Sequence, residues 1–241
     1  MPTRSENLFT RSDARALVAP SILSADFGHM ARDAGAVLAA GADLLHVDVM
    51  DGSFAPNLTM GPDMVRGLRS ALPGAFLDVH LMLDEPERFI EPFANAGADH
   101  LTFHAEVCGN LNGAVGRPTL EDLVGRVRAL GCSVGVAVNP ETDAEPLLGQ
   151  AGALDLVLVM SVRPGFSGQR FMPKVLDKTR AFAGLAGDGG RPLRVEMDGG
   201  LDAETAPLVQ EAGCSVLVAG SAVFGRSRSE WADVIRRIRC E

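Results

Sequence analysis

Short apolar runs rich in Val, Leu and Ile recur along the chain, and segments with helical periodicity lie between them. The apolar runs predict eight strands, at Val18–Leu23, Leu44–Met50, Phe76–Met82, His100–His104, Ser133–Val138, Leu154–Val162, Leu193–Met197 and Ser215–Val218. The periodic segments predict helices that include Gly28–Ala40, Asp63–Ala71, Pro86–Ala96, Leu120–Leu130 and Ala203–Ala212. Strands that alternate with helices in this way indicate βαβ units and a parallel sheet.

A closed barrel explains this pattern better than an open sheet. An open doubly wound sheet normally carries a GxGxxG turn after its first strand, whereas this chain continues with Pro20-Ser21-Ile22-Leu23-Ser24-Ala25-Asp26. The length of 241 residues suits one domain, and no linker or change of composition divides it. We therefore predict an α/β fold, a single-domain (β/α)8 TIM barrel over residues 17–241, with a flexible N-terminal extension over 1–16.

Charge and composition limit the possible partners. The formal net charge of −9 argues against general binding to nucleic acid or to an anionic membrane. No apolar run has the length of a membrane span, and Met1–Ala16 lacks the apolar core of a secretory signal. The four cysteines are scattered and form no CxxC pair, which is typical of free thiols in a reducing compartment. We expect a cytoplasmic protein whose ligand, if anionic, is held by a metal ion or by backbone N–H groups.

Polar residues inside the apolar strands are the main candidates for chemistry. His46 and Asp48 share one face of the second predicted strand, while His80 and Asp198 lie near the ends of the third and seventh. All four lie toward the carboxyl ends of strands, where barrel enzymes assemble their sites. A single buried histidine or aspartate is usually structural, but four unpaired polar groups at one depth would be costly without a cation. Two imidazoles and two carboxylates suit a mononuclear divalent metal.

The remaining histidines are weaker candidates. His29 begins a helical segment, and His100 and His104 share a face of the fourth strand. His104 lies close enough to the strand end to line a site, but we expect a structural role for both His100 and His104.

Glycine-rich turns follow the last three strands and predict a phosphate site. They are Met160–Gln169 after the sixth strand, Asp198-Gly199-Gly200 after the seventh and Ala219-Gly220-Ser221-Ala222 after the eighth. Glycine lets backbone approach a ligand closely, and N–H groups at helix starts bind oxyanions. Met50, Met82 and Met160 also fall at strand ends. They are either core residues or a flexible apolar cap over the reaction centre.

These motifs resemble those of the ribulose-phosphate 3-epimerase family. The matching stretches run from Val18 to about Phe224 and are Ala19–Phe27, His46–Gly52, Pro56-Asn57, Gly61-Pro62, Asp78–Met82, His104-Ala105-Glu106, Asn139-Pro140, Pro164-Gly165-Phe166, Gly168-Gln169 and Asp198-Gly199-Gly200. The resemblance implies a metal-dependent isomerase of the pentose phosphate pathway and Calvin cycle. Its substrate would be a sugar phosphate, and the chain would form a homo-oligomer.

The resemblance also implies roles for individual residues. His46, Asp48, His80 and Asp198 would hold one divalent metal ion per subunit, zinc, iron, manganese or cobalt, and Asp48 and Asp198 would be the acid/base pair. The substrate-binding residues would be Ser21, His80, Met50, Met82, Met160, Gly165, Phe166, Ser167, Gly168, Gly199, Gly200, Gly220 and Ser221. Epimerisation of ribulose 5-phosphate to xylulose 5-phosphate would proceed by removal of the C3 proton on one face and its return on the other.

Other reactions stay open at this point. An epimerase for another ketose phosphate, such as allulose 6-phosphate, could use the same groups, and so could a metal-assisted lyase. A Schiff-base aldolase needs a lysine inside the barrel, but Lys174 and Lys178 are the only lysines and follow the sixth strand's loop. A non-catalytic sugar-phosphate sensor is a further alternative.

Three features depart from the family pattern. Ser167 stands where a second glycine is common, Arg163 could touch phosphate or face solvent, and Val107–Thr119 is longer than expected. That last segment could cover the mouth, join an oligomer contact or be a solvated insertion without a role.

Overall fold

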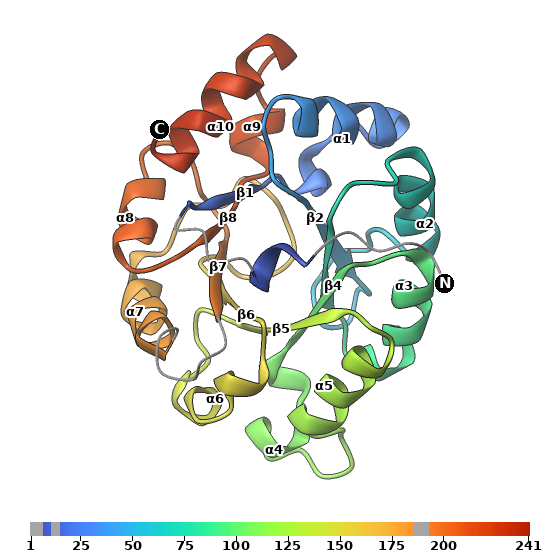
Figure 1. Ribbon diagram of the computed structural model, residues 1–241. Coiled ribbons are helices and arrows are strands. Elements are labelled where there is room, and N and C mark those ends of the chain that lie inside the picture. Colours follow the sequence, from blue (N-terminus) through green and yellow to red (C-terminus); the bar gives the residue numbers. More distant parts are fainter. Residues whose placement is uncertain (1–6, 11–14, 186–192) are drawn as a thin grey trace.

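A computed structural model describes residues 7–10, 15–185 and 193–241. Its eight strands form one parallel sheet in the order β1-β8-β7-β6-β5-β4-β3-β2. They are β1 (Leu17–Ala19), β2 (Leu45–Met50), β3 (Leu77–Met82), β4 (His100–His104), β5 (Ser133–Val138), β6 (Leu156–Met160), β7 (Arg194–Asp198) and β8 (Val216–Val218). The sheet closes between β1 and β2, where the His46 N–H donates to Pro20 O at 3.1 Å and Ser21 forms a parallel bridge with His46. The predicted (β/α)8 barrel is confirmed (Figure 1).

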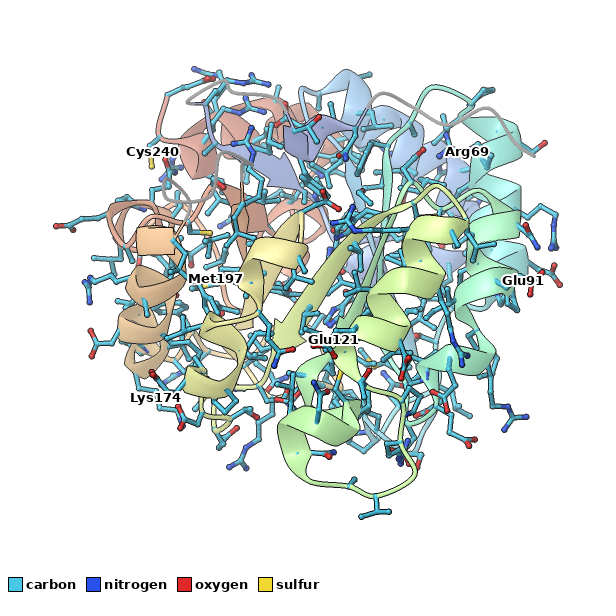
Figure 2. All side chains as sticks on the ribbon, turned by 60° about the horizontal axis from the view of Figure 1, so that its bottom comes forward. Arg69, Glu91, Glu121, Lys174, Met197 and Cys240 are labelled. Atoms are coloured by element: carbon cyan, nitrogen blue, oxygen red, sulfur yellow. The ribbon has the colours of Figure 1, made fainter. Side chains whose placement is uncertain are left out.

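The helices surround the strands as an outer layer (Figure 1). They are α1 (Met30–Ala39), α2 (Pro62–Ala71), α3 (Ile90–Ala96), α4 (Gly109–Asn112), α5 (Leu120–Ala129), α6 (Glu145–Leu148), α7 (Leu176–Leu185), α8 (Ala206–Glu211), α9 (Ser221–Phe224) and α10 (Trp231–Arg239). Charged side chains such as Glu91 and Lys174 project from the periphery (Figure 2), whereas Met197 is fully buried. No helix in the described part of the chain has the length and apolar character needed to span a bilayer.

Several element boundaries differ from those predicted. The first strand ends at Ala19 instead of Leu23, because Pro20 has no N–H for the sheet and Ile22–Ser24 forms a 3-10 turn. Helix α1 starts two residues later than predicted, after a separate turn at Phe27–His29. The side chain of Asp26 begins that turn by accepting the Gly28 N–H at 2.9 Å.

Most other predicted ends shift by one to four residues, whereas the fourth and fifth strands have the predicted bounds. Strand β6 is shorter than Leu154–Val162, and Pro86–Arg88 forms a 3-10 turn ahead of α3. Helix α8 occupies only the middle of Ala203–Ala212. Gly97 ends α3 in the left-handed region at φ 114°.

Besides a small third cluster that contains Met50, Ala55 and Met82, two large apolar clusters form most of the core. The larger one lies between the strands and the helices, while the smaller one includes inward residues such as Leu158, Met160 and Val218. Phe9 also belongs to the smaller cluster and is fully buried. Its ring makes edge contacts with Phe76 at 5.1 Å and His100 at 4.7 Å, at the amino-terminal ends of the strands.

Phe9 lies in a 3-10 helix, Leu8–Thr10, within the stretch that we predicted to be a flexible extension. This short helix appears in dark blue over the centre of the barrel in Figure 1. Part of the predicted extension therefore packs as the floor of the barrel. Residues 1–6 and 11–14 of that stretch lie outside the described residues.

The unusually long segment Val107–Thr119 folds against the side of the barrel. It contains α4, and the Gly109 N–H donates to Pro118 O at 2.9 Å, which closes the segment on itself. Arg117 donates to the carbonyl of Asp84, and Asn110 Oδ1 accepts the Leu120 N–H at 2.9 Å. None of its residues lines the pocket at the barrel mouth, so in this structure the segment does not cover that pocket.

Candidate active site

Strand register brings the candidate metal ligands together. In the β2–β3 ladder Asp48 pairs with His80, and Met50 pairs with Met82 one layer higher. Asp198 ends β7 and pairs with Met160 of β6 and Val218 of β8. Because alternate residues of each strand face the barrel interior, His46 and Asp48 point to the same side.

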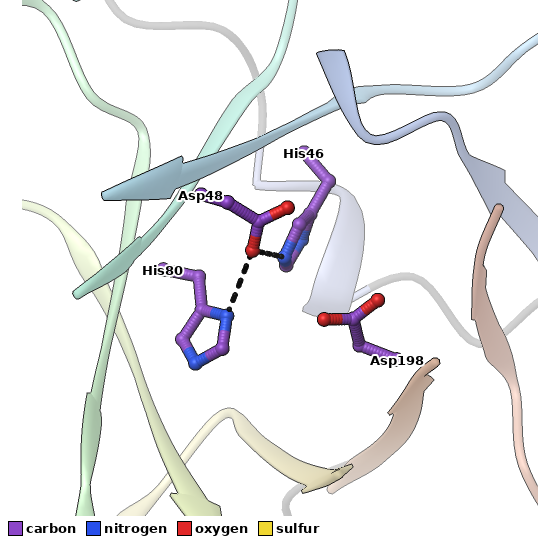
Figure 3. A group of neighbouring side chains, drawn as sticks. All are labelled: His46, Asp48, His80 and Asp198. Atoms are coloured by element: carbon purple, nitrogen blue, oxygen red, sulfur yellow. Dashed lines mark hydrogen bonds and ion pairs between the residues drawn. The ribbon is translucent and has the colours of Figure 1, made fainter. Parts of the chain in front are cut away.

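The four predicted ligands form one compact group (Figure 3). Each of His46, Asp48, His80 and Asp198 offers a donor atom, and these atoms all lie within 4.8 Å of one another. Asp48 Oδ1 lies 3.3 Å from His46 Nε2 and 3.2 Å from His80 Nδ1. The two histidines are fully buried, whereas Asp198 is partly exposed to the pocket.

This group fits a divalent metal ion. His46 Nε2 is buried and, within the described residues, has no aligned hydrogen-bond partner. A buried imidazole nitrogen in that state is destabilising unless a cation or proton satisfies it. Two imidazoles with two carboxylates are a donor set used by zinc, iron, manganese and cobalt. The chain can therefore hold a metal at this position.

Neighbouring main-chain and hydroxyl groups fix the two aspartates. Ser21 Oγ donates to Asp48 Oδ2 at 2.5 Å, and Thr59 Oγ1 donates to the Asp48 carbonyl at 2.7 Å. Ser161, just after β6, donates its N–H and its Oγ to the Asp198 carbonyl at 2.8 and 2.9 Å. Both carboxylates are therefore held on rigid strand ends.

The two aspartates have opposite pKa shifts. Burial opposes ionisation of Asp48, but the charge of His46 and the hydrogen bonds with His46 and His80 together outweigh it and hold the Asp48 pKa well below its usual range. Burial and then the charge of Asp48 raise the pKa of Asp198 to about 7. At neutral pH one carboxylate is thus ionised, while the other can carry a proton.

The two histidines differ as well. Burial lowers the pKa of His80 to about 4, so its ring is neutral at pH 7. Burial also opposes the charged form of His46, but the charges of Asp48 and Asp78 raise its pKa well above the ordinary value. A metal bound at His46 must therefore displace a proton.

A pocket opens above this group at the carboxyl ends of the strands. The volume of the pocket, including the space at its open mouth, is about 530 Å³. This size suits a small ligand. Nearly all predicted substrate-binding residues line it, namely Ser21, Met50, Met82, Met160, Gly165, Phe166, Ser167, Gly168, Gly199, Gly200, Gly220 and Ser221. His80 is the exception, because its ring is fully buried and does not line the pocket. A direct contact between His80 and substrate has no support in this geometry.

Backbone forms the side of the pocket opposite the β2–β3 ladder. Gly200 has φ +63°, and a Cβ there would lie 2.4 Å from Phe171 N; a Cβ on Gly199 would lie 2.5 Å from Val162 Cγ2. Side chains larger than hydrogen therefore do not fit without movement of the loops. Asn57 Nδ2 donates to Gly165 O at 2.8 Å and ties the loop after β6 to the loop after β2.

Two of the departures from the family pattern, Ser167 and Arg163, lie in the loop after β6. Ser167 is not among the residues with positive φ, so this position does not need glycine. Arg163 lines the pocket but is exposed, and its Nε donates to Glu141 Oε1 at 3.1 Å.

Two polar groups behind the metal ligands were not predicted. Asp78 and Glu196 lie two residues before His80 and Asp198 on the same strand faces, and both are fully buried. Asp78 Oδ2 lies 2.7 Å from His46 Nδ1, and Glu196 Oε1 lies 3.6 Å from it. The signal that identified His80 and Asp198, a polar residue inside an apolar strand, also marks these two.

His104, for which we expected a structural role, contacts a predicted ligand. Its Nε2 lies 2.9 Å from His80 Nε2, and its ring is stacked on that of His80. His100 instead bonds Ser133 and Thr102 near the barrel floor.

The structure is that of a barrel protein with a candidate metal site at its mouth. A buried histidine–aspartate group forms this site, and glycine-rich loops line the rim beside it. Comparison with known proteins places the chain more narrowly. It belongs to the ribulose-phosphate 3-epimerase family, whose family model matches residues 17–224.

Individual relatives agree with this assignment. A ribulose-phosphate 3-epimerase of Bacillus subtilis (strain 168) is 47% identical over 213 residues, which cover 87% of this chain and 93% of the relative. A ribulose-phosphate 3-epimerase of Oryza sativa subsp. japonica, cytoplasmic isoform, is 41% identical over 229 residues and 94% of each chain. The crystal structure of a 3-hexulose-6-phosphate synthase superimposes with a TM-score of 0.63 over 93% of this chain and 98% of that one, at 18% identity. That last likeness concerns the fold alone.

Proposed function

We propose that this protein interconverts D-ribulose 5-phosphate and D-xylulose 5-phosphate by proton transfer at C3. The observation that carries the proposal is the pair Asp48 and Asp198, which line one pocket from strands separated by β1 and β8 and have opposite pKa shifts. Family membership and the names of the relatives support the substrate.

The two carboxylates have different roles in the proton transfer. Asp48 is ionised and accepts the C3 proton from one face of the ketose, while Asp198, with a pKa of about 7, holds a proton that it delivers to the other face. The roles exchange in the reverse direction. Ser21 donates to one oxygen of Asp48, while the other oxygen lies between the rings of His46 and His80.

His46, Asp48, His80 and Asp198 would hold the metal ion. A divalent metal there supplies a Lewis acid that polarises the C2 carbonyl and stabilises negative charge on the sugar oxygens. Zinc, iron, manganese and cobalt all suit the donor set, and their identity stays a prediction.

The rest of the pocket binds and shields the substrate. The phosphate would rest on backbone around Gly165, Ser167, Gly168, Gly200 and Gly220, which the local glycines leave accessible. Met50, Met82 and Met160 are nearly fully buried beside the site and would exclude water above the reacting carbon. The cytoplasmic rice relative supports a cytoplasmic location, and homo-oligomer formation stays a prediction from the family resemblance.

Proton NMR in deuterated water tests the proposal. Metal-replete enzyme is incubated with ribulose 5-phosphate, and a chelator-treated sample is the control. We expect xylulose 5-phosphate with deuterium at C3 only in the metal-replete sample. If folded, metallated protein gives neither product nor exchange, the assignment of this reaction is wrong. Faster turnover of allulose 6-phosphate would reassign the substrate and keep the reaction.

A further inference from the structure

Strands β4 and β5 contribute no residue to the lining of the pocket, although the strands on either side of them do. One chain of polar contacts, buried at the two histidines and partly buried at Glu106, nevertheless joins these two strands to the site. It starts at His80 of β3 and passes through His104, the last residue of β4. It then reaches Glu106 in the turn after β4 and ends on the loop after β5.

Every contact along this chain has hydrogen-bond distance. His80 Nε2 and His104 Nε2 are 2.9 Å apart, and His104 Nδ1 is 2.9 Å from Glu106 Oε2. Glu106 Oε1 accepts the backbone N–H of Asn139 at 2.8 Å and the hydroxyl of Thr142. Both imidazole rings are fully buried, so water does not replace the contact between them, whereas the Glu106 side chain is partly exposed.

The direction of the hydrogen bonds follows from the donors available. An ionised carboxylate only accepts. Burial opposes ionisation of Glu106, but its interactions with His104, Thr142 and Asn139 together outweigh burial and lower the Glu106 pKa to about 2. His104 must then carry its proton on Nδ1, and the Nε2 of a neutral ring is an acceptor. His80 consequently donates from Nε2, which leaves Nδ1 without a proton and directed toward Asp48.

We propose that His104 and Glu106 are positioning residues that hold His80 in the tautomer with its proton on Nε2, so that Nδ1 is the metal-binding atom. Neither residue lines the pocket. The inference rests on the proposed function, since it takes the histidine–aspartate group as that reaction's metal site. Hydrogen bonds behind a ligating histidine fix its tautomer and commonly change metal affinity by about 10- to 100-fold.

Glu106→Gln gives the sharpest test because it reverses the direction of the hydrogen bonds between residue 106, His104 and His80. The backbone N–H of Asn139 can only donate, so the new amide oxygen must face it and the NH2 group must face His104. His104 then keeps its proton on Nε2, and His80 must accept there and carry a proton on Nδ1. His104→Gln is the conservative companion, because its oxygen can accept from His80 while its NH2 group donates to Glu106.

The measurements are Zn²⁺ affinity, by competition with a chromophoric chelator, and ¹⁵N NMR of the histidine rings in the zinc-loaded protein. We expect a proton on His80 Nε2 in the unmodified protein. Glu106→Gln should weaken Zn²⁺ binding by about 10- to 100-fold, and His104→Gln by about threefold or less. Glu121→Gln changes the same charge at an exposed position and should leave the affinity unchanged.

A purely structural role predicts a different result. Both variants would lower the melting temperature of the metal-free protein while Zn²⁺ affinity stayed within about twofold of the unmodified protein, and this outcome would overturn the proposal. A proton on His80 Nδ1 in the zinc-loaded protein would overturn it too. If Glu106→Gln weakens Zn²⁺ binding but the unmodified enzyme does not convert ribulose 5-phosphate, the proposed reaction falls and the positioning role stands.

Discussion

The proposed metal-binding and phosphate-binding halves of the pocket would present different atoms of the chain to the substrate. The metal half consists of side chains on β2, β3 and β7, and further buried groups such as Asp78 and His104 support them from behind. The phosphate half consists of backbone in the loops after β6, β7 and β8, where glycines leave space that a Cβ would occupy. Side-chain substitutions should therefore change chemistry and metal affinity in the first half. In the second half, even one added methyl group should weaken substrate binding.

Removing either acid/base group should have the largest effect. Asp48→Asn and Asp198→Asn each abolish proton transfer at C3 and weaken the metal site, so kcat should fall by about 10³-fold or more. The check is kcat under saturating Zn²⁺ together with circular dichroism to verify the fold. Turnover within about tenfold of the unmodified enzyme in either variant would remove that residue from the mechanism.

Gly200→Ala should weaken substrate binding without changing metal binding. Its Cβ would lie 2.4 Å from Phe171 N at φ +63°, so the loops after β6 and β7 must move apart. Loss of one charge-assisted hydrogen bond to phosphate, worth about 1.5–3 kcal/mol, should raise KM by about 10- to 100-fold. Zn²⁺ affinity should stay unchanged.

Gly125→Ala is a matched control for that substitution, because nothing lies within 4 Å of a Cβ at this helical position. It should leave KM unchanged. An equal rise of KM and of the Zn²⁺ dissociation constant in Gly200→Ala would show that the two halves are not independent.

A pH series should reveal the smaller difference between the halves. Metal competes with protons at Asp198, whose pKa is raised to about 7, and at His46, whose pKa is raised well above its usual value. Zn²⁺ affinity should therefore increase about 10- to 100-fold per pH unit between pH 5.5 and 6.5. Backbone N–H groups do not titrate, so binding of sulfate as a phosphate mimic should change by less than about threefold. A flat Zn²⁺ profile would mean that these protons are not displaced.

Much of the fold could be predicted from local pattern alone. Apolar runs identified all eight strands, and polar residues within them identified His46, Asp48, His80 and Asp198. The first strand was predicted too long because its apolar run continues beyond Pro20, where the sheet cannot. The floor residue Phe9 could not be found, since one phenylalanine in a polar segment has no periodicity and its burial depends on tertiary contacts.

The groups behind the metal ligands show where sequence reasoning stops. Asp78 and Glu196 carry the same signal as the ligands and differ from them only by depth in the barrel. The role proposed for His104 and Glu106 depends on the pairing of β3 with β4 and on contacts with the loop after β5. Such contacts join residues far apart in sequence, so the order of residues gives no direct indication of them.

The ring of Phe9 determines the side from which water approaches the centre of the barrel. It fills the space beside Phe76 and His100 at the amino-terminal ends of the strands, below the buried carboxylates of Asp78 and Glu196. Bulk solvent is thereby kept from the rear of the metal ligands. Asp198 lines the pocket and is partly exposed there, so solvent protons would reach it on the face that a bound substrate would cover. A bound sugar would thus isolate the acid from solvent exchange, so the proton that Asp198 delivers to C3 would be the one it held when the sugar bound.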